Sequence, residues 1–341
     1  MSEKIEFTPK PKEGEPWDVA IVGSGPASLT AAIYTTRGAA STLILGGEIW
    51  GGQLMLTTTV DNYPGFPEGV QGPDLMQLMR KQAERFGAEF VQKSVESINF
   101  NPPAGGPKEL IADGKKYLAK SVIIATGADT KWLGVAGEEK LRGRGVSSCA
   151  PCDAPFFKEK NVAVVGGGDA AMEEALVLTK YASSVTMIHR RNEFKASAAM
   201  QKRVFDKEKE GKIKILWNTE IVEFIGDQKL EKIKIKNNQS GETTEMPIDG
   251  VFVAIGHIPA TEMFKDKLEL DERGYIVRMP TEHQGEVEEK KHFHTKTSYP
   301  GVFVAGDVHD HVYRQAITAA GFGCMAGMDA LRYLDKATPS W

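Results

Sequence analysis

An apolar run that ends in a glycine-rich turn occurs twice in this chain, and this repeat constrains the fold more than any other feature. Residues 18–22 lead into GSGPAS at 23–28, and residues 161–165 lead into GGGDAA at 166–171. The helices expected after these turns are 29–37 and 172–181, and the next expected strands are 42–45 and 184–189. Strand, turn, helix and strand form a βαβ unit. Two such units so far apart predict an α/β fold with two separate Rossmann-like dinucleotide-binding domains.

Three further apolar stretches end in small residues and are expected to be buried strands. They lie at 122–128, 251–256 and 301–307, and the last one precedes a helix expected over 314–334. This weak self-similarity suggests duplication of one nucleotide-binding fold. The chain has 341 residues, which suits about two domains of roughly 150 residues each.

Composition and charge argue against several functional classes. The formal net charge of −4 argues against an electrostatic nucleic-acid binder. No apolar run approaches the ~20 residues of a transmembrane helix, and the polar N-terminus does not resemble a secretory signal. Three cysteines are an odd, sparse count that favours a reducing cytosol over a disulfide-stapled secreted domain. We therefore expect a cytoplasmic protein that binds neither nucleic acid nor a membrane.

The first glycine turn has the mechanics of a pyrophosphate site. Gly23 allows a tight turn, and Gly25 lets the backbone approach a ligand at the positive end of the following helix. Ser28, in place of a third glycine or alanine, is small enough for helix–strand packing. Glu48 is the candidate acid near the end of the second strand, although Gly46 and Gly47 occupy its usual place. The alternative is a glycine-rich turn without a ligand.

The second glycine turn is followed by basic residues where an NADH-specific fold carries an acid. His189, Arg190 and Arg191 end its second expected strand. Arginines at this place accommodate a 2′-phosphate, whereas a carboxylate would bind the ribose hydroxyl. The pattern therefore favours NADPH over NADH. The alternative is a basic strand end that faces solvent.

Cys149, Cys152 and Asp153 form a CxxCD motif. Two cysteines at this spacing can close a small, reducible disulfide ring, and the adjacent carboxyl can exchange a proton with the leaving thiolate. Zinc is an alternative, but a structural zinc site takes four ligands and the chain has no second CxxC. Two inert buried thiols are the other alternative. Cys324 lies in an Ala/Gly-rich helical stretch and is expected in the core.

The polar stretch 279–296 is interpreted as an exposed loop or hairpin. Its His283, His292 and His294 could form a metal site, but solvated loop histidines are the preferred interpretation.

Several motifs, in their order and spacing, resemble low-molecular-weight thioredoxin reductases of the class II pyridine nucleotide-disulfide oxidoreductases. They are GSGPAS at 23–28, GGQL at 51–54, ATGA at 125–128, CAPCD at 149–153, GGGDAA at 166–171, HRR at 189–191, IGHIP at 255–259 and GDVHDHVYRQA at 306–316. The similarity runs nearly end to end. CxxCD just before the second glycine turn, with GDV and YRQA near the C-terminus, is its most specific part.

The resemblance implies an FAD-binding domain built from residues 1–128 and 257–341, with an NADPH-binding domain at 129–256 inserted between them. In the FAD-binding domain it implies contacts from Gly23, Ser24, Gly25, Pro26, Ala27, Gly46, Glu48, Gly51, Gly52, Gln53, Asn62, Gly306, Asp307, Arg314, Gln315 and Ala316. In the NADPH-binding domain it implies contacts from Gly166, Gly168, Asp169, Ala170, His189, Arg190, Arg191 and Lys195. No metal is implied.

The resemblance also implies a reaction. Hydride passes from NADPH to FAD, then to the Cys149–Cys152 disulfide, and dithiol–disulfide exchange then reduces thioredoxin. Cys152 would lie against the flavin, Cys149 would attack the disulfide of the protein substrate, and Asp153 would act as acid–base. Family members are homodimers whose NADPH domain rotates, with hinges expected near 127–128 and 256–257.

The chain departs from the family pattern at three places. Lys195 replaces a third arginine and keeps the charge without the bidentate geometry, which would weaken the preference for NADPH. Ala150 and Pro151 replace Ala-Thr between the cysteines, and the proline stiffens the ring. The stretch 279–296 is longer than usual.

Two alternative functions stay open at this point. One is a reductase of the same fold that serves another protein disulfide or a small-molecule disulfide. The other is a flavin-based redox sensor whose CxxC responds without turnover. Steady-state consumption of NADPH with an acceptor separates an enzyme from a sensor.

Overall fold

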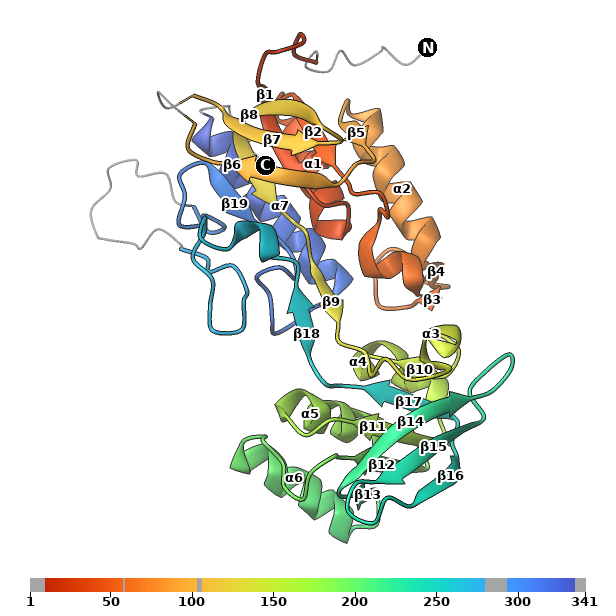
Figure 1. The fold of residues 1–341 in the computed structure, drawn as a ribbon. Coiled ribbons are helices and arrows are strands. Elements are labelled where there is room, and N and C mark those ends of the chain that lie inside the picture. The colour runs from red at the N-terminus through yellow and green to blue at the C-terminus, as the bar shows by residue number, and fades with distance from the viewer. Residues whose placement is uncertain (1–9, 58, 103–105, 280–292, 335–341) are drawn as a thin grey trace, which may run out of the picture. The chain divides into compact units, whose positions relative to one another are not determined.

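The computed structural model describes residues 10–57, 59–102, 106–279 and 293–334 (Figure 1). The chain divides into two compact units: the first is Met1–Asp129 with Pro259–Trp341, and the second is Thr130–Ile258. Each unit has its own sheet with parallel strands. The predicted fold class, two Rossmann-like domains with the second inserted into the first, is therefore confirmed.

The first unit is built on a seven-stranded sheet of order β5-β2-β1-β8-β7-β6, with β19 also paired to β8. The strands of the first unit are β1 (Trp17–Val22), β2 (Thr42–Leu45), β3 (Thr59–Val60), β4 (Val70–Gln71), β5 (Glu89–Val91), β6 (Val95–Asn99), β7 (Lys108–Ala112), β8 (Lys115–Ile124) and β19 (Val302–Val304). Of these, β3 and β4 lie outside the seven-stranded sheet and pair with each other. Its helices are α1 (Pro26–Arg37), α2 (Gly72–Arg85) and α7 (Ala316–Tyr333), with 3₁₀ turns η1 (Gly52–Leu56) and η4 (Glu262–Phe264). Strands β5, β2, β1, β8 and β19 pair in parallel, whereas β7 pairs antiparallel with both of its neighbours, β8 and β6.

Both faces of this sheet are covered at its parallel strands, which explains why residues 19–22 of β1 and 43–45 of β2 are all apolar. Val19 and Ile21 of β1 pack with α1, α2 and α7. Their neighbours Ala20 and Val22 pack on the opposite face with β6, β7 and Phe264. The ends of strands β1, β2 and β8 are therefore supported by packed side chains on both faces of the sheet.

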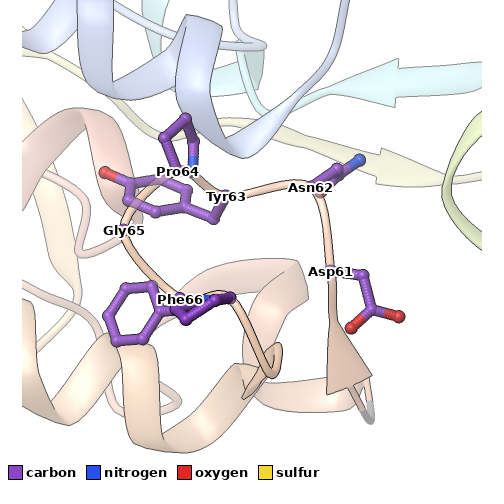
Figure 2. A pocket seen from close by; sticks show the side chains of 7 residues that line it. Asp61, Asn62, Tyr63, Pro64, Gly65 and Phe66 are labelled. Atoms are coloured by element: carbon purple, nitrogen blue, oxygen red, sulfur yellow. The ribbon is translucent and has the colours of Figure 1, made fainter.

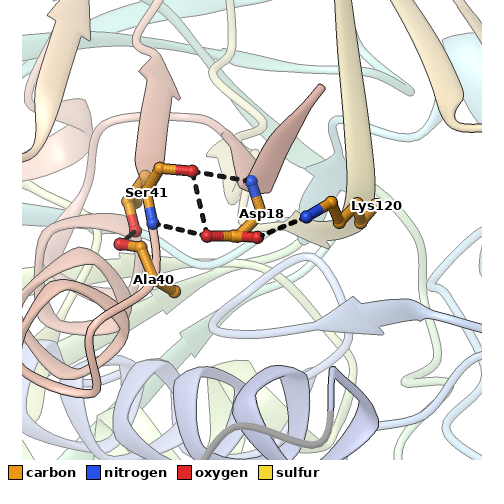
Figure 3. Close-up of polar contacts among 5 residues, drawn as sticks. Asp18, Ala40, Ser41 and Lys120 are labelled. Carbon is orange, nitrogen blue, oxygen red and sulfur yellow. Dashed lines mark hydrogen bonds and ion pairs between the residues drawn. The ribbon is translucent and has the colours of Figure 1, made fainter. Parts of the chain in front are cut away.

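A buried polar network closes the start of this sheet (Figure 3). The Asp18 carboxylate accepts hydrogen bonds from the N–H and hydroxyl of Ser41 at 2.9 and 3.0 Å, and Lys120 Nζ lies 2.9 Å from its other oxygen. Ser41 Oγ also accepts from the Asp18 N–H at 2.9 Å. The network joins β1, β8 and the loop before β2, and Asp18 is only 6% exposed.

Asp18→Ala is expected to destabilise the protein by about 3 kcal/mol, because it leaves two buried donors of Ser41 without their acceptor. Urea unfolding of the FAD-loaded protein measures the change. Asp113→Asn is the control, since its pair with Lys93 at 3.1 Å is largely exposed and exposed pairs contribute little to stability. Asparagine also tolerates the positive φ of this position. Equal effects of the two substitutions would refute this account of the network.

The second unit is built on a five-stranded parallel sheet of order β10-β17-β11-β12-β13. Its strands are β10 (Val146–Ser147), β11 (Asn161–Val165), β12 (Ser184–Ile188), β13 (Ile213–Leu216), β14 (Thr219–Ile225), β15 (Lys232–Asn237), β16 (Thr243–Pro247) and β17 (Gly250–Val253). Its helices are α3 (Glu138–Leu141), α4 (Ala150–Asp153), α5 (Asp169–Leu178) and α6 (Ala198–Lys209), with the 3₁₀ turn η3 (Ala154–Phe157). One face packs on α4, α5 and α6, and the other on the antiparallel sheet β14-β15-β16.

Two connecting strands, β9 (Ala128–Thr130) and β18 (His257–Pro259), pair with each other where the chain passes from one unit to the other. The glycines beside them, Gly127 and Gly256, have positive φ angles of +74° and +113°. A Cβ at either glycine would meet open space among the described residues.

Several predicted elements end at other residues than expected. The first helix begins at Pro26 rather than 29 because proline suits the first helical position, and α5 runs over Asp169–Leu178 instead of 172–181. The last helix begins at Ala316 rather than 314, because Arg314 has a φ of +47° and Gln315 caps the helix. Most of the stretch 279–296, with His283 and His292, lies outside the described residues.

Candidate active site and dinucleotide-binding sites

Cys149 and Cys152 are joined by a disulfide, with their Cα atoms 5.3 Å apart. Cys149 is the N-cap of the single-turn helix α4. Its carbonyl oxygen accepts hydrogen bonds from the N–H groups of Cys152 and Asp153 at 3.2 and 3.1 Å. Pro151 fits this first turn, which needs no N–H donor there. Both cysteines are half-buried, so part of the disulfide ring packs against the protein and part of it is exposed.

Asp153 directly follows Cys152 at the end of α4, and its side chain is half-buried. Burial raises the pKa of Asp153, and a hydrogen bond from Ser147 opposes that shift. Ser147 Oγ donates to Asp153 Oδ2 at 2.6 Å. A carboxyl with a raised pKa retains a proton closer to neutral pH, as an acid–base group for thiol chemistry requires.

The first glycine turn brings several predicted cofactor positions together in the first unit. Ser24 Oγ donates to the carbonyl of Gly46 at 2.6 Å and accepts from the N–H of Gly51 at 2.9 Å. Gly23 has a φ of +119°, and a Cβ there would lie 2.2 Å from the carbonyl oxygen of Ala125. Only glycine fits this position.

Beside this turn, the backbone is open at the start of α1. A Cβ at Gly25 would meet open space among the described residues, and one at Gly52 would lie 3.7 Å from Gly25 Cα. Gly25 is the N-cap of α1, whose first turn consists of Pro26, Ala27 and Ser28. The open space at Gly25 thus lies at the N-terminus of α1, the end of a helix that favours an anion such as a pyrophosphate.

Asp307 follows β19 in the same unit and has an unsatisfied carboxyl oxygen. Its Oδ1 is buried and has no hydrogen-bond partner among the described residues. Burial, then the nearby Asp310, raises the pKa of Asp307 to about 6, while Arg314 opposes the shift. The preceding Gly306 has a φ of +77° and lies against Ala27 of α1, where a Cβ would come within 2.9 Å of the Ala27 Cβ.

The segment after Asp307 is held by Asp310. Its carboxylate accepts hydrogen bonds from the N–H groups of Val312, Tyr313 and Arg314 at 2.9, 3.0 and 3.2 Å. This cap fixes the positive φ of Arg314 and starts α7 at Ala316, with Gln315 as the N-cap.

A surface cavity of about 560 Å³ is lined by residues 61–67 (Figure 2). The rings of Tyr63 and Phe66 have centroids 6.4 Å apart. Asn62 Nδ2 donates to Gln315 Oε1 at 3.1 Å and so ties this loop to the start of α7. The amide of Gln53 is also engaged, donating to Asp129 at 2.8 Å. The side chain of Glu48 is exposed.

The second glycine turn repeats the first within the second unit. A Cβ at Gly166 would lie 2.5 Å from the carbonyl oxygen of Ala254, and one at Gly168 would meet open space among the described residues. Gly168 is the N-cap of α5, which begins with Asp169 and Ala170.

Hydrogen bonds fix the loop after β12 to this turn. The N–H of Lys195 donates to the carbonyl of Gly167 at 2.8 Å. The N–H and hydroxyl of Ser197 donate to Asp169 Oδ1 at 2.9 and 2.7 Å. Lys195, with Arg190 and Arg191, has an exposed side chain in the same loop. Three cations are thus available on one short loop beside the start of α5.

His189 lies beneath the turn rather than in the open. It is 8% exposed, and its Nε2 is 2.9 Å from the carbonyl of Glu193. A Cβ at Gly167 would come within 2.3 Å of its ring. Burial lowers the pKa of His189, so the neutral ring packs with Phe194 and Trp217.

Three residues that the sequence analysis did not single out support these sites: Ser147, Ser197 and Asp310. Each is a short polar residue just before a helix or turn, where side chains of this type hydrogen-bond to backbone N–H groups. That signal marks a cap, but it does not identify the carboxyl or the loop that the residue contacts.

Comparison with known proteins places the chain in one family. The family model for pyridine nucleotide-disulphide oxidoreductases matches residues 17–323. A thioredoxin reductase of Streptomyces coelicolor is 47% identical, covering 94% of this chain and 97% of the relative. A bifunctional thioredoxin reductase/thioredoxin of Mycobacterium leprae is 45% identical over 93% of this chain and 66% of its own length.

A solved structure agrees with these relatives. Thioredoxin reductase from Giardia duodenalis superposes with a TM-score of 0.84 at 40% identity, covering 94% of this chain and 99% of the other. Separately, the described part of the chain contains no helix that is both long and apolar enough to cross a membrane.

Proposed function

This chain belongs to the thioredoxin reductases, within the pyridine nucleotide-disulphide oxidoreductase family, and we propose that its substrate is the disulfide of a thioredoxin. It is an NADPH-dependent flavoprotein disulfide oxidoreductase, and its cofactors are FAD and NADPH. The observation that carries the proposal is the half-buried Cys149–Cys152 disulfide, which is followed directly by Asp153, a carboxyl whose pKa is raised by burial. The name of the Mycobacterium leprae relative, which joins a reductase to a thioredoxin, supports the choice of partner.

The first unit fits FAD. The open backbone at Gly25 suits a pyrophosphate, and the unsatisfied Asp307 Oδ1 suits a donor such as a hydroxyl of the ribityl chain. Asn62 and Gln315, which are hydrogen-bonded to each other, form part of the same proposed site. When bound, FAD supplies a carrier for an electron pair between NADPH and the disulfide.

Asp307 predicts opposite pH trends for stability and for cofactor affinity. Its pKa of about 6 lies above the ordinary value of about 4, so the folded apoprotein binds the proton more tightly than the unfolded chain. The contribution of Asp307 to the stability of the apoprotein should therefore fall as pH rises from about 4 to 6. FAD affinity should rise over the same range, because only the ionised carboxylate has both oxygens free to accept hydrogen bonds.

Asp307→Asn should remove both trends and weaken FAD binding about tenfold or more. Thermal unfolding of the apoprotein and quenching of FAD fluorescence on binding measure the two effects. The exposed Asp113 provides the control substitution Asp113→Asn. Unchanged FAD affinity in Asp307→Asn would exclude the proposed contact.

The second unit fits NADPH. The open backbone at Gly168 precedes α5, and exposed Arg190, Arg191 and Lys195 lie on the loop fixed to that turn. Arginine binds phosphate oxygens through paired N–H groups, while lysine contributes a point charge. We propose that these three cations bind the 2′-phosphate of NADPH.

The exchange chemistry uses this chain's own residues. An electron pair and one proton open the disulfide and give a thiolate at Cys149 and a thiol at Cys152. The Cys149 thiolate then attacks one sulfur of the partner's disulfide and forms a mixed disulfide, while the released thiolate takes up a proton. Cys152 passes its thiol proton to Asp153 and attacks Cys149 in turn, which restores the Cys149–Cys152 disulfide and, once the leaving thiolate is protonated, leaves a dithiol on the partner. In this proposal Asp153 holds and returns the proton.

Three further features complete the proposal. The chain acts as a homodimer and in the cytoplasm, as inferred from its family and its sparse cysteines. The linkers at Gly127 and Gly256 act as hinges, since their positive φ angles and open surroundings allow the backbone to rotate.

Steady-state oxidation of NADPH tests the proposed function. Turnover that depends on oxidised thioredoxin is the expected result. Turnover only with a small-molecule disulfide or another protein disulfide would contradict the choice of substrate. Reduction of the flavin without turnover on any acceptor would identify a sensor instead of an enzyme.

A further inference from the structure

Ser147 belongs to a cycle of hydrogen bonds that links it to Cys149 and Asp153 beside the disulfide in the sequence. Its Oγ accepts from the N–H of Cys149 at 3.1 Å and donates to Asp153 Oδ2 at 2.6 Å. The cycle is closed by the N–H of Asp153, which donates to the carbonyl of Cys149 at 3.1 Å. Ser147 thus connects the carboxyl of the proposed acid–base group to the backbone of the proposed attacking cysteine.

The position of Ser147 is fixed by the sheet of the second unit. Ser147 ends β10, which pairs in parallel with β17, and it lies in register with the fully buried Phe252. The residue itself is 7% exposed. Asp153, by contrast, ends the single turn α4. The Ser147 hydroxyl is therefore held by a residue paired into the sheet, and it hydrogen-bonds to a carboxyl on a one-turn helix.

The direction of these hydrogen bonds follows from the groups involved. A backbone N–H only donates, so Ser147 Oγ accepts from Cys149 and keeps its own proton for Asp153. An ionised carboxylate only accepts, so this proton stabilises the charged form of Asp153. Removing the hydroxyl therefore raises the pKa of Asp153 further above its ordinary range.

Other charged groups do not account for the pKa of Asp153. Helix α5 and the turn η3 pack against α4. The turn η3 has the sequence APFF and so carries no charge. The acidic side chains of α5 are Asp169, Glu173 and Glu174. The shift in the pKa of Asp153 comes from burial and from Ser147, so the serine is the group through which a substitution can tune it.

We propose that Ser147 is a positioning residue for disulfide exchange, which orients the carboxyl of Asp153 and sets the pH range over which it transfers a proton. The inference rests on the proposed function, because it assigns Asp153 to the exchange step. It concerns a serine outside the CxxCD motif.

The proposal is tested with Ser147→Ala, Ser147→Thr and the adjacent control Ser148→Ala. Ser148 suits the comparison because its hydroxyl lies 3.2 Å from Thr130 Oγ1. The first readout is the titration of Asp153 in the oxidised protein, followed by carbon-13 NMR of labelled aspartate and assigned by its loss in Asp153→Asn. Ser147→Ala should raise the pKa of Asp153, because the hydrogen bond from Ser147 lowers it. Ser147→Thr and Ser148→Ala should leave it near the native value.

The second readout is the pH profile of thioredoxin reduction. The limb that reports Asp153 should move to higher pH in Ser147→Ala by the same amount, and the shift should vanish when Asp153→Asn is also present. An unshifted pKa of Asp153 in an active Ser147→Ala enzyme would overturn the proposal, as would a limb that still shifts in the double variant. Absence of thioredoxin turnover in the wild type counts instead against the proposed function.

Discussion

Replacing either Cys149 or Cys152 with serine is expected to abolish thioredoxin reduction, with a loss on the order of 10³-fold or more. The two sulfurs are bonded to each other in the structure, and the electron pair must open that bond before a thiolate can attack a partner. A serine hydroxyl cannot form the disulfide and is a poor nucleophile at neutral pH. NADPH oxidation coupled to oxidised thioredoxin measures the loss.

The same two variants should still accept electrons from NADPH at the flavin, because the proposed FAD and NADPH sites contain neither cysteine. Cys324→Ser is the matched control. Cys324 is the third cysteine, half-buried on α7 outside the disulfide, and its replacement should leave turnover within about twofold of the wild type. Substantial thioredoxin reduction by Cys149→Ser or Cys152→Ser would remove the disulfide from the mechanism.

The double substitution Arg190→Ala, Arg191→Ala should lower kcat/KM for NADPH about 100-fold while leaving kcat/KM for NADH nearly unchanged. Each charge-assisted hydrogen bond to a phosphate contributes about 1.5–3 kcal/mol, or roughly tenfold or more in binding. NADH lacks the 2′-phosphate and loses nothing when the arginines are removed. Initial rates with both nucleotides measure the ratio.

Lys195→Arg extends this test in the opposite direction. A guanidinium at this position restores the paired N–H geometry that lysine lacks, so selectivity for NADPH should increase. Arg273→Ala, an exposed arginine of the first unit, is the control for general loss of positive charge. If the double arginine variant reduces the use of NADH and NADPH equally, the loop after β12 does not recognise the 2′-phosphate.

The glycine turns and the CxxCD motif could be recognised from the sequence because their requirements are local. Gly23 and Gly166 each lie against a carbonyl oxygen that excludes a side chain, at Ala125 and at Ala254. The run of apolar residues before each turn reflects sheets that are covered on both faces. These constraints act over a few residues and so appear as a pattern.

The supporting contacts could not be read in the same way because they join residues distant in the sequence or depend on side-chain direction. Asn62 and Gln315 are 253 positions apart, and Ser197 meets Asp169 across 28 positions. The start of α7 was expected at 314, yet the cap by Asp310 gives Arg314 a positive φ and delays the helix to Ala316. A propensity for helix does not reveal a carboxylate that competes for the same N–H groups.

The burial of His189 illustrates the same difficulty within a recognised motif. The sequence places it in line with Arg190 and Arg191, but directly after the end of β12 its ring is buried against Gly167. The side chains of Arg190 and Arg191 are exposed. We expect the arginines to contact the nucleotide and the histidine to support the turn.

A count of thiols after anaerobic reduction tests the central claim most directly. The oxidised chain has three cysteines, two of them in the disulfide, so one thiol per chain should react with a chromogenic disulfide reagent under denaturing conditions. After treatment with NADPH and removal of the nucleotide, the account predicts three reactive thiols, whereas treatment with NADH at the same concentration should leave most chains with one. One thiol after NADPH, with the flavin bleached, would show that electrons stop before Cys149 and Cys152 and would contradict the account.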